Sequence, residues 1–181
     1  MTFLPMVDSD ELGTDQRTDL SSERPQTAAP FGNFGATIRS HPLSLSASLQ
    51  LSSLWDALVP CLGERAVSFF AYAISDENRC LLWVAHLRRI LISTGEDADH
   101  PDVTETEQLL IDWGRRIARD SVEISAEFYD RLELAFQPQL RLLLVSFAGQ
   151  MIATNVVSSA GRVPLDSELS EYRKPGDLRI S

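Results

Sequence analysis

Apolar side chains recur every three or four positions along most of the chain outside its N-terminal part, which is the spacing of a helix with one buried face. Leu51, Leu54 and Leu58 show this spacing within residues 43–58, so we expect a helix there. Pro60 has no backbone N–H to donate, and it should end that helix or begin the next. No stretch of useful length alternates apolar and polar residues as a strand does. The pattern therefore predicts an all-α fold of six or more helices.

Capping signals set the expected ends of the later helices. Thr104 and Glu107 have the spacing of a capping box, in which each side chain accepts from the backbone N–H of the other residue. Ser75, followed by acidic residues, predicts an N-cap, and Gly95 predicts the end of the same helix. The predicted helical segments are residues 43–58, 62–74, 76–94, 104–119, a stretch after Ser125, residues 138–159 and a short helix between Pro164 and Pro175.

The most apolar of these segments is the last long one. Residues 142–157 contain no charged side chain, but Ser146, Gln150 and Asn155 interrupt the run. The run is also shorter than the roughly 18 residues that suggest a membrane span. We therefore expect a buried, central helix of the fold and no contact with a membrane.

The chain is expected to divide into an extended arm, residues 1–42, and one helical domain, residues 43–181. The arm is acidic and rich in Ser, Thr, Pro and Gly without sustained periodicity. Nearly every later segment carries an apolar stripe, which is more than a single small helical layer can bury. We expect a homo-oligomer in which the arm lies across a neighbouring subunit.

The charge of the chain excludes two classes of binding partner. A formal net charge of −10 opposes binding to nucleic acid or to anionic lipid, because both require clustered cations. The N-terminus lacks the cationic and hydrophobic regions of a signal peptide, so we expect a cytoplasmic protein. The chain has two cysteines, Cys61 and Cys80, which in a reducing compartment do not predict a disulfide framework.

The candidate chemistry lies in the stretch ENRCLLWVAHL, residues 77–87, where Cys80, Trp83 and His86 follow one another at intervals of three. His41 and His100 do not combine with His86 in a metal-binding spacing. No glycine-rich phosphate loop occurs either. We therefore expect neither a metal site nor the commonest kind of nucleotide site.

Several segments resemble the carboxymuconolactone decarboxylase family, which includes the AhpD-like alkylhydroperoxidases. They are, in chain order, NRC…W..H, RRILISTGED, TETEQLLIDWGRRIARD and FAGQMIATNVVSSAGRVPLD. The resemblance covers roughly residues 40–172. It implies an AhpD-like helical domain and an obligate oligomer, which we expect to be a dimer, trimer or hexamer.

The motif of the peroxidase branch is incomplete. That branch has C-x-x-C followed by histidine, so that a thiolate attacks the peroxide and the second thiol resolves the sulfenic acid. Cys80 matches the first cysteine, but Trp83 occupies the second position. His86 lies six residues after Cys80, whereas the commonest arrangement has seven. The acid expected in the preceding helix is absent, and Glu64 is the nearest candidate.

The decarboxylase branch does not depend on a cysteine pair and is the better chemical analogue. The resemblance therefore predicts a lyase, isomerase or decarboxylase that acts without a cofactor on a small carbonyl compound or hydrophobic metabolite, including one of specialised biosynthesis. An apolar pocket should keep the His86 imidazole neutral, so that it can carry a proton to and from the carbon beside the carbonyl. The candidate catalytic residues are His86, Cys80 and Glu64, and the candidate substrate-binding residues are Trp83, Tyr72 and Phe147.

Two other functions remain open at this point. One is a degenerate AhpD-like thiol peroxidase that uses Cys80 with an external thiol. The other is a non-catalytic binding or assembly protein of the same fold, in which Cys80, Trp83 and His86 are ordinary core residues.

Overall fold

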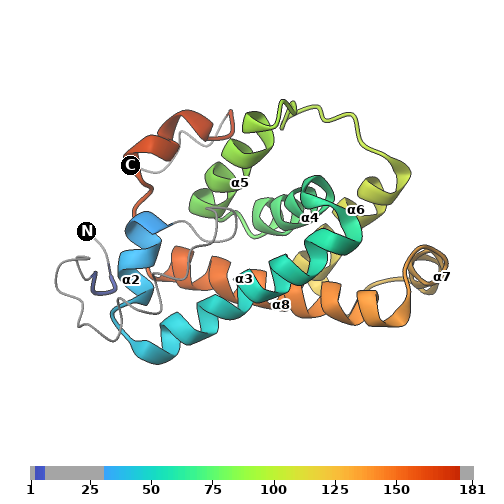
Figure 1. Cartoon of the computed structure of the whole chain (residues 1–181), viewed down its shortest axis with the longest axis horizontal. Coiled ribbons are helices and arrows are strands. Elements are labelled where there is room, and N and C mark those ends of the chain that lie inside the picture. The colour runs from blue at the N-terminus through green and yellow to red at the C-terminus, as the bar shows by residue number, and fades with distance from the viewer. Residues whose placement is uncertain (1–2, 7–30, 176–181) are drawn as a thin grey trace.

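The computed structural model describes residues 3–6 and 31–175, and all regular structure in this part of the chain is helical, without a strand. The predicted all-α class is confirmed. The elements are η2 (Phe31–Gly35), α2 (Ala36–Ile38), α3 (Pro42–Leu62), α4 (Glu64–Glu77), α5 (Leu81–Ser93), α6 (Glu105–Asp120), α7 (Ala126–Ala135), α8 (Pro138–Ala160) and the 3-10 helix η3 (Ser167–Tyr172) (Figure 1).

The central helix is α4. Every residue from 66 to 75 is buried, because α3, α5, α6 and α8 all contact this helix. The sequence placed residues 138–159 at the centre instead, and that expectation is wrong. The corresponding helix, α8, buries only one face and leaves Leu142 and Val156 exposed.

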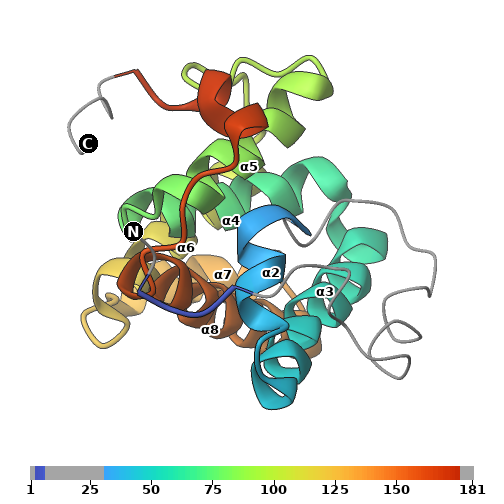
Figure 2. The ribbon, with the colours of Figure 1, turned by 90° about the vertical axis from the view of Figure 1, so that its left-hand side faces the viewer.

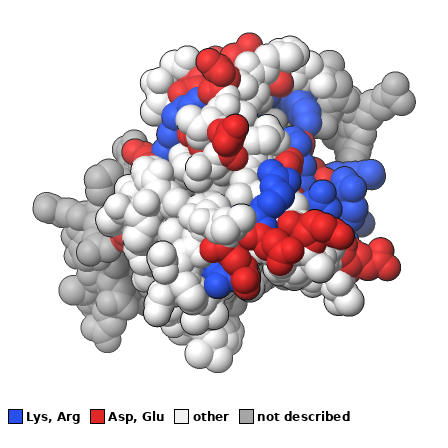
Figure 3. All heavy atoms as spheres, turned by 90° about the vertical axis from the view of Figure 1, so that its right-hand side faces the viewer, with Lys and Arg blue, Asp and Glu red and all other residues white. Residues whose placement is uncertain are grey.

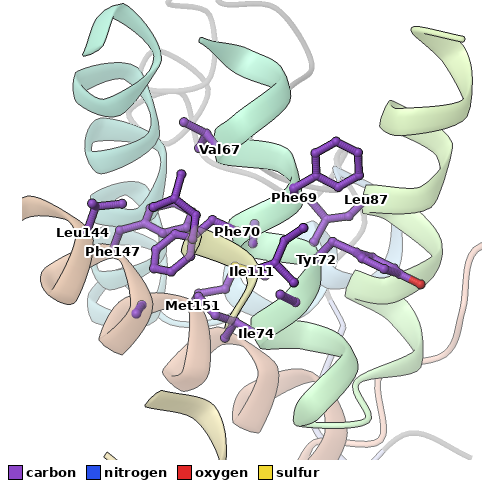
Figure 4. Close-up of a cluster of buried hydrophobic side chains, with 14 of the residues drawn as sticks. Val67, Phe69, Phe70, Tyr72, Ile74, Leu87, Ile111, Leu144, Phe147 and Met151 are labelled. Carbon is purple, nitrogen blue, oxygen red and sulfur yellow. The ribbon is translucent and has the colours of Figure 1, made fainter. Parts of the chain in front are cut away.

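Aromatic rings join α4 to two of its neighbours. The Phe70 ring of α4 lies 6.0 Å from that of Phe147 on α8 and 6.2 Å from that of Trp113 on α6. Figure 4 shows Phe70 and Phe147 within this cluster. Gly114 lets α6 approach α4 closely, since a Cβ atom there would lie 3.1 Å from the backbone oxygen of Phe70.

The boundary between α4 and α5 differs from the expected one. Ser75 is not an N-cap but lies inside α4, where its hydroxyl donates to Oδ1 of Asn155 at 3.3 Å. The chain leaves α4 through Arg79, whose φ of 54° is in the left-handed region. The N–H of Cys80 then donates to the oxygen of Ser75, as in a Schellman motif. Cys80 is the N-cap of α5.

Other helix ends agree with the sequence. Thr104 and Glu107 form the predicted capping box at the start of α6, and the Ser125 side chain caps α7. Gly95, with a φ of 89°, follows α5 as expected. Pro60 does not end α3, which continues to Leu62. A proline is tolerated so near the end of a helix because it removes only one of the last backbone hydrogen bonds.

The N-terminal arm is described only in part. Residues 31–38 are helical rather than extended, and Phe34 and Ile38 pack into the core. Phe3 donates its backbone N–H to the oxygen of Gly161, just after α8. Residues 1–2 and 7–30 lie outside the described part of the chain, and so does any contact of theirs with a neighbouring subunit.

Candidate functional site

Cys80, Trp83 and His86 are brought together at the beginning of α5, and all three are buried, with exposed fractions of 1%, 2% and 1%. Trp83 and His86 are neighbours one turn apart on α5, and Cys80, the N-cap residue, lies one turn before Trp83. The helix η3 contacts α5, and Figure 2 shows the two elements side by side.

Trp83 is firmly packed. Its indole N–H donates to Oγ of Ser158 on α8 at 3.2 Å. The rings of Phe34 and His86 each meet the Trp83 ring edge-on, with centroid separations of 5.6 Å. Trp83 thus links η2, α5 and α8 in the interior.

His86 is connected to the surface through an arginine. Nδ1 of the His86 ring lies 3.4 Å from a guanidinium nitrogen of Arg89, one turn later in α5. Since a guanidinium only donates, this contact is a hydrogen bond only when Nδ1 carries no proton. Arg89 also pairs with the Glu168 carboxylate on η3 at 3.1 Å, and the Glu168 side chain is 73% exposed.

Cys80 is an unfavourable nucleophile. Burial raises the pKa of its thiol, although hydrogen bonds from the backbone of Trp83 and from the hydroxyls of Ser159 and Ser158 partly oppose this. Less thiolate is therefore present near neutral pH than for an exposed cysteine. Cys61 is exposed near the end of α3, and the two cysteines are not joined by a disulfide.

The remaining candidates lie elsewhere. Glu64 is exposed at the first position of α4, and among the described residues its carboxylate has no hydrogen bond to Cys80 or His86. Phe147 is fully buried between Trp55 and Phe70, so it is a core residue. Figure 4 shows Phe147 among the other core side chains.

Tyr72 belongs to a second cluster of polar side chains, between α4 and α5. It interacts with the buried guanidinium of Arg88, which also donates to both carboxylate oxygens of Asp99, at 2.6 and 3.0 Å. Tyr72 and Asp99 line a cavity of about 100 Å³, and the ion pair between Lys174 and Asp76 lies at the same cavity. Arg88 is not among the site residues predicted from the sequence, although an arginine within the apolar run LRRIL is a signal for a buried ion pair.

Among residues 3–6 and 31–175, no three His, Cys, Asp or Glu side chains lie close enough together to hold a metal ion. Within this part of the chain, α8 is the one helix that is long and apolar enough to cross a membrane. No protein-family model matches the sequence, and no curated protein is significantly similar to it.

Proposed function

We propose that this chain is a carboxymuconolactone decarboxylase-like enzyme, a lyase or isomerase that acts on a small carbonyl compound without a metal or an organic cofactor. The observation that carries the proposal is the buried His86 ring in contact with Arg89. A buried imidazole can carry a proton to and from carbon, and a guanidinium beside it can stabilise the negative charge that develops on the substrate.

His86 would act as the base of the proton transfer. In the neutral tautomer that carries its proton on Nδ1, the lone pair of Nε2 would accept the proton that leaves the carbon beside the substrate carbonyl, which breaks the C–H bond and forms an imidazolium. The imidazolium then gives that proton to the same or the neighbouring carbon, and the neutral ring is restored. The guanidinium of Arg89, which lies 3.4 Å from Nδ1, would stabilise the negative charge of the developing enolate.

Arg89 adds a preference for acidic substrates. Its guanidinium is held by Glu168, whose side chain is mostly exposed and lies on η3. A substrate carboxylate can replace that of Glu168 in a charge-assisted contact of the same kind. Since His86 is 1% exposed, the substrate reaches it only when a segment beside α5 moves, and exchange of Glu168 for the substrate would release η3.

The peroxidase alternative has less support. It needs an accessible thiolate, and the thiol of Cys80 is buried with a raised pKa. It also needs a second thiol, and Trp83 fills that position with its indole hydrogen-bonded to Ser158. An external thiol would have to enter the same closed interior.

Deuterium exchange tests the proposal even when the final product is not identified. We would incubate the protein in D₂O with a panel of small keto acids and lactone acids and follow loss of the proton beside the carbonyl by NMR. We expect exchange with at least one compound. His86→Gln should lower its rate by about 10² to 10⁴, the usual contribution of acid–base catalysis.

The matched control is His100→Gln, because His100 lies in a loop with its side chain 88% exposed. This variant should exchange the substrate proton as fast as the unaltered protein. Equal rates in His86→Gln would contradict the role of His86. Binding of a panel compound at α5 without any exchange would favour a non-catalytic binding protein.

A further inference from the structure

Two helices form a face that is almost free of charge. Asp56 is the only charged residue of α3, and Arg141 is the only one of α8, although the chain as a whole carries −10. The two helices contact each other and lie side by side in Figures 1 and 2. Seen from the α7 end in Figure 3, charged side chains gather on one half of the molecule and the other half is largely uncharged.

The outer side of α8 carries an exposed apolar stripe. Leu142, Val145 and Val156 are 70%, 47% and 57% exposed. Gly149 and Ala153, also exposed, lie between them at the spacing of one helix face. At Gly149 the surface is open, because no atom lies within 4 Å of the place where a Cβ would be.

The stripe is symmetric about Gly149. Leu142 and Val156 each lie seven positions from this glycine, and Val145 and Ala153 each lie four positions from it. If two α8 helices cross antiparallel at Gly149, Leu142 of one copy meets Val156 of the other, and Val145 meets Ala153. This is the reciprocal pairing that a two-fold interface requires.

We propose that α8 is the contact surface between two copies of this chain, with the two-fold axis at Gly149. Two copies that each carry −10 repel one another least through a face with few acidic residues; α8 has none, and α3 has one, Asp56. Neither a bilayer nor an unrelated protein needs a stripe that pairs with itself when reversed.

A groove lies beside the stripe, where the second copy would contact it. It measures about 370 Å³ and is lined by residues of α3 and α8 that include Leu43, Ala47, Ala153 and Val157. In the antiparallel arrangement Leu142 of the second copy lies next to Val156, at the edge of this groove. A side chain that is 70% exposed in one copy is thereby covered by the other. The interface is independent of any chemistry at His86.

Cysteine cross-linking tests the register. In a Cys61→Ser background, which removes the exposed native thiol, Gly149→Cys should form a disulfide-linked dimer under mild oxidation. At the two-fold axis the α-carbons of the two copies lie within the roughly 7 Å that a disulfide needs. A mixture of Leu142→Cys and Val156→Cys chains should also cross-link, whereas neither variant should cross-link with itself. A mixture that stays uncoupled would overturn the proposed register.

Substitution tests the surface itself. Val145→Asp should shift the protein from dimer to monomer in light scattering, because it places a charge in the interface. The control is Leu134→Asp on α7, where the native side chain is 90% exposed and outside the stripe. Circular dichroism checks that both variants keep their helices. A monomeric unaltered chain would overturn the proposal, and so would flotation with phosphatidylcholine vesicles that Val145→Asp abolishes, which would assign the face to a bilayer.

Discussion

The helices α4 and α8 are both apolar, but only one of them is central. α4 has charged residues at both ends, and still every residue from 66 to 75 is buried. α8 has none from residue 142 to 160, and still Leu142 and Val156 are exposed. The number of helices that pack against a helix, and not its apolar content, therefore decides how much of that helix is buried. Apolar surface beyond what those neighbours cover marks a contact with something else.

The charges around the two helices differ in the same way. Ion pairs surround α4 and the adjacent part of α5: Arg65 with Glu96 and Glu107, Arg88 with Asp99, Arg119 with Glu77, and Lys174 with Asp76. The only ion pair of α8 among the described residues joins Arg141 to Glu133 near its start. Lowering the pH should therefore weaken the ion pairs around α4 before it affects the packing of α8.

The largest predicted effect contrasts a side chain on each helix. Phe70→Ala in α4 removes a ring with no exposed surface, and should lower the free energy of unfolding by about 3–5 kcal/mol. Val145→Ala in α8 should lower it by less than about 1 kcal/mol when the protein is dilute, because that side chain is half exposed. Urea denaturation of both variants measures this. Similar losses would show that α8 is as central as α4.

A second, smaller effect concerns the ion pair of Arg88. Its hydrogen bonds lower the pKa of Asp99 from the ordinary value of 3.8. A lowered pKa means that Asp99 stabilises the fold above about pH 4 and that this contribution is lost as the pH falls below 3.8. At pH 7, Asp99→Asn should cost about 1.5–3 kcal/mol, towards the lower end because Asp99 is 34% exposed.

The measurement for Asp99 is urea denaturation at several pH values. The difference in unfolding free energy between the unaltered chain and Asp99→Asn should shrink steadily as the pH is lowered from 5 to below about 3. Asp112→Asn is a suitable control, because Asp112 makes no ion pair among the described residues and its only hydrogen bond there is to Gln108. A difference that is constant with pH would show that the Asp99 charge does not act through Arg88.

Sequence reasoning succeeded where the determinants are local. The capping box at Thr104 and the glycine at position 95 were found because each signal depends on residues within one turn. The end of α4 was missed because Arg79, not a glycine, adopts the left-handed conformation there. The Ser75 hydroxyl, the expected cap, is instead hydrogen-bonded to Asn155, eighty positions away in the sequence.

The candidate site shows the same division. The sequence correctly placed Trp83 and His86 on one helix, since helical periodicity is local, but Cys80 is the N-cap of that helix and not inside it. What surrounds them was not predictable, because Phe34, Ser158 and Glu168 come from distant segments. Tyr72 and Phe147, the other predicted substrate-binding residues, lie apart from this group: Tyr72 lines a different cavity, and Phe147 belongs to the hydrophobic core.

The smallest predicted effect compares the ends of the two helices. An arginine with positive φ follows the end of each helix: Arg79 follows α4 with a φ of 54°, and Arg162 follows α8 with a φ of 52°. Both side chains are exposed. This conformation costs a non-glycine residue about 1–2 kcal/mol in the folded state. Glycine avoids that cost, but part of the gain is lost because glycine has more conformational freedom in the unfolded chain. Arg79→Gly and Arg162→Gly should therefore each raise the free energy of unfolding by about 0.5–1 kcal/mol.

Gly95→Ala, at a φ of 89°, should lower the free energy of unfolding by a similar amount. Thermal and urea unfolding of the three variants measure these changes, and a loss of stability in Arg79→Gly would mean that its side chain contributes more than its backbone costs.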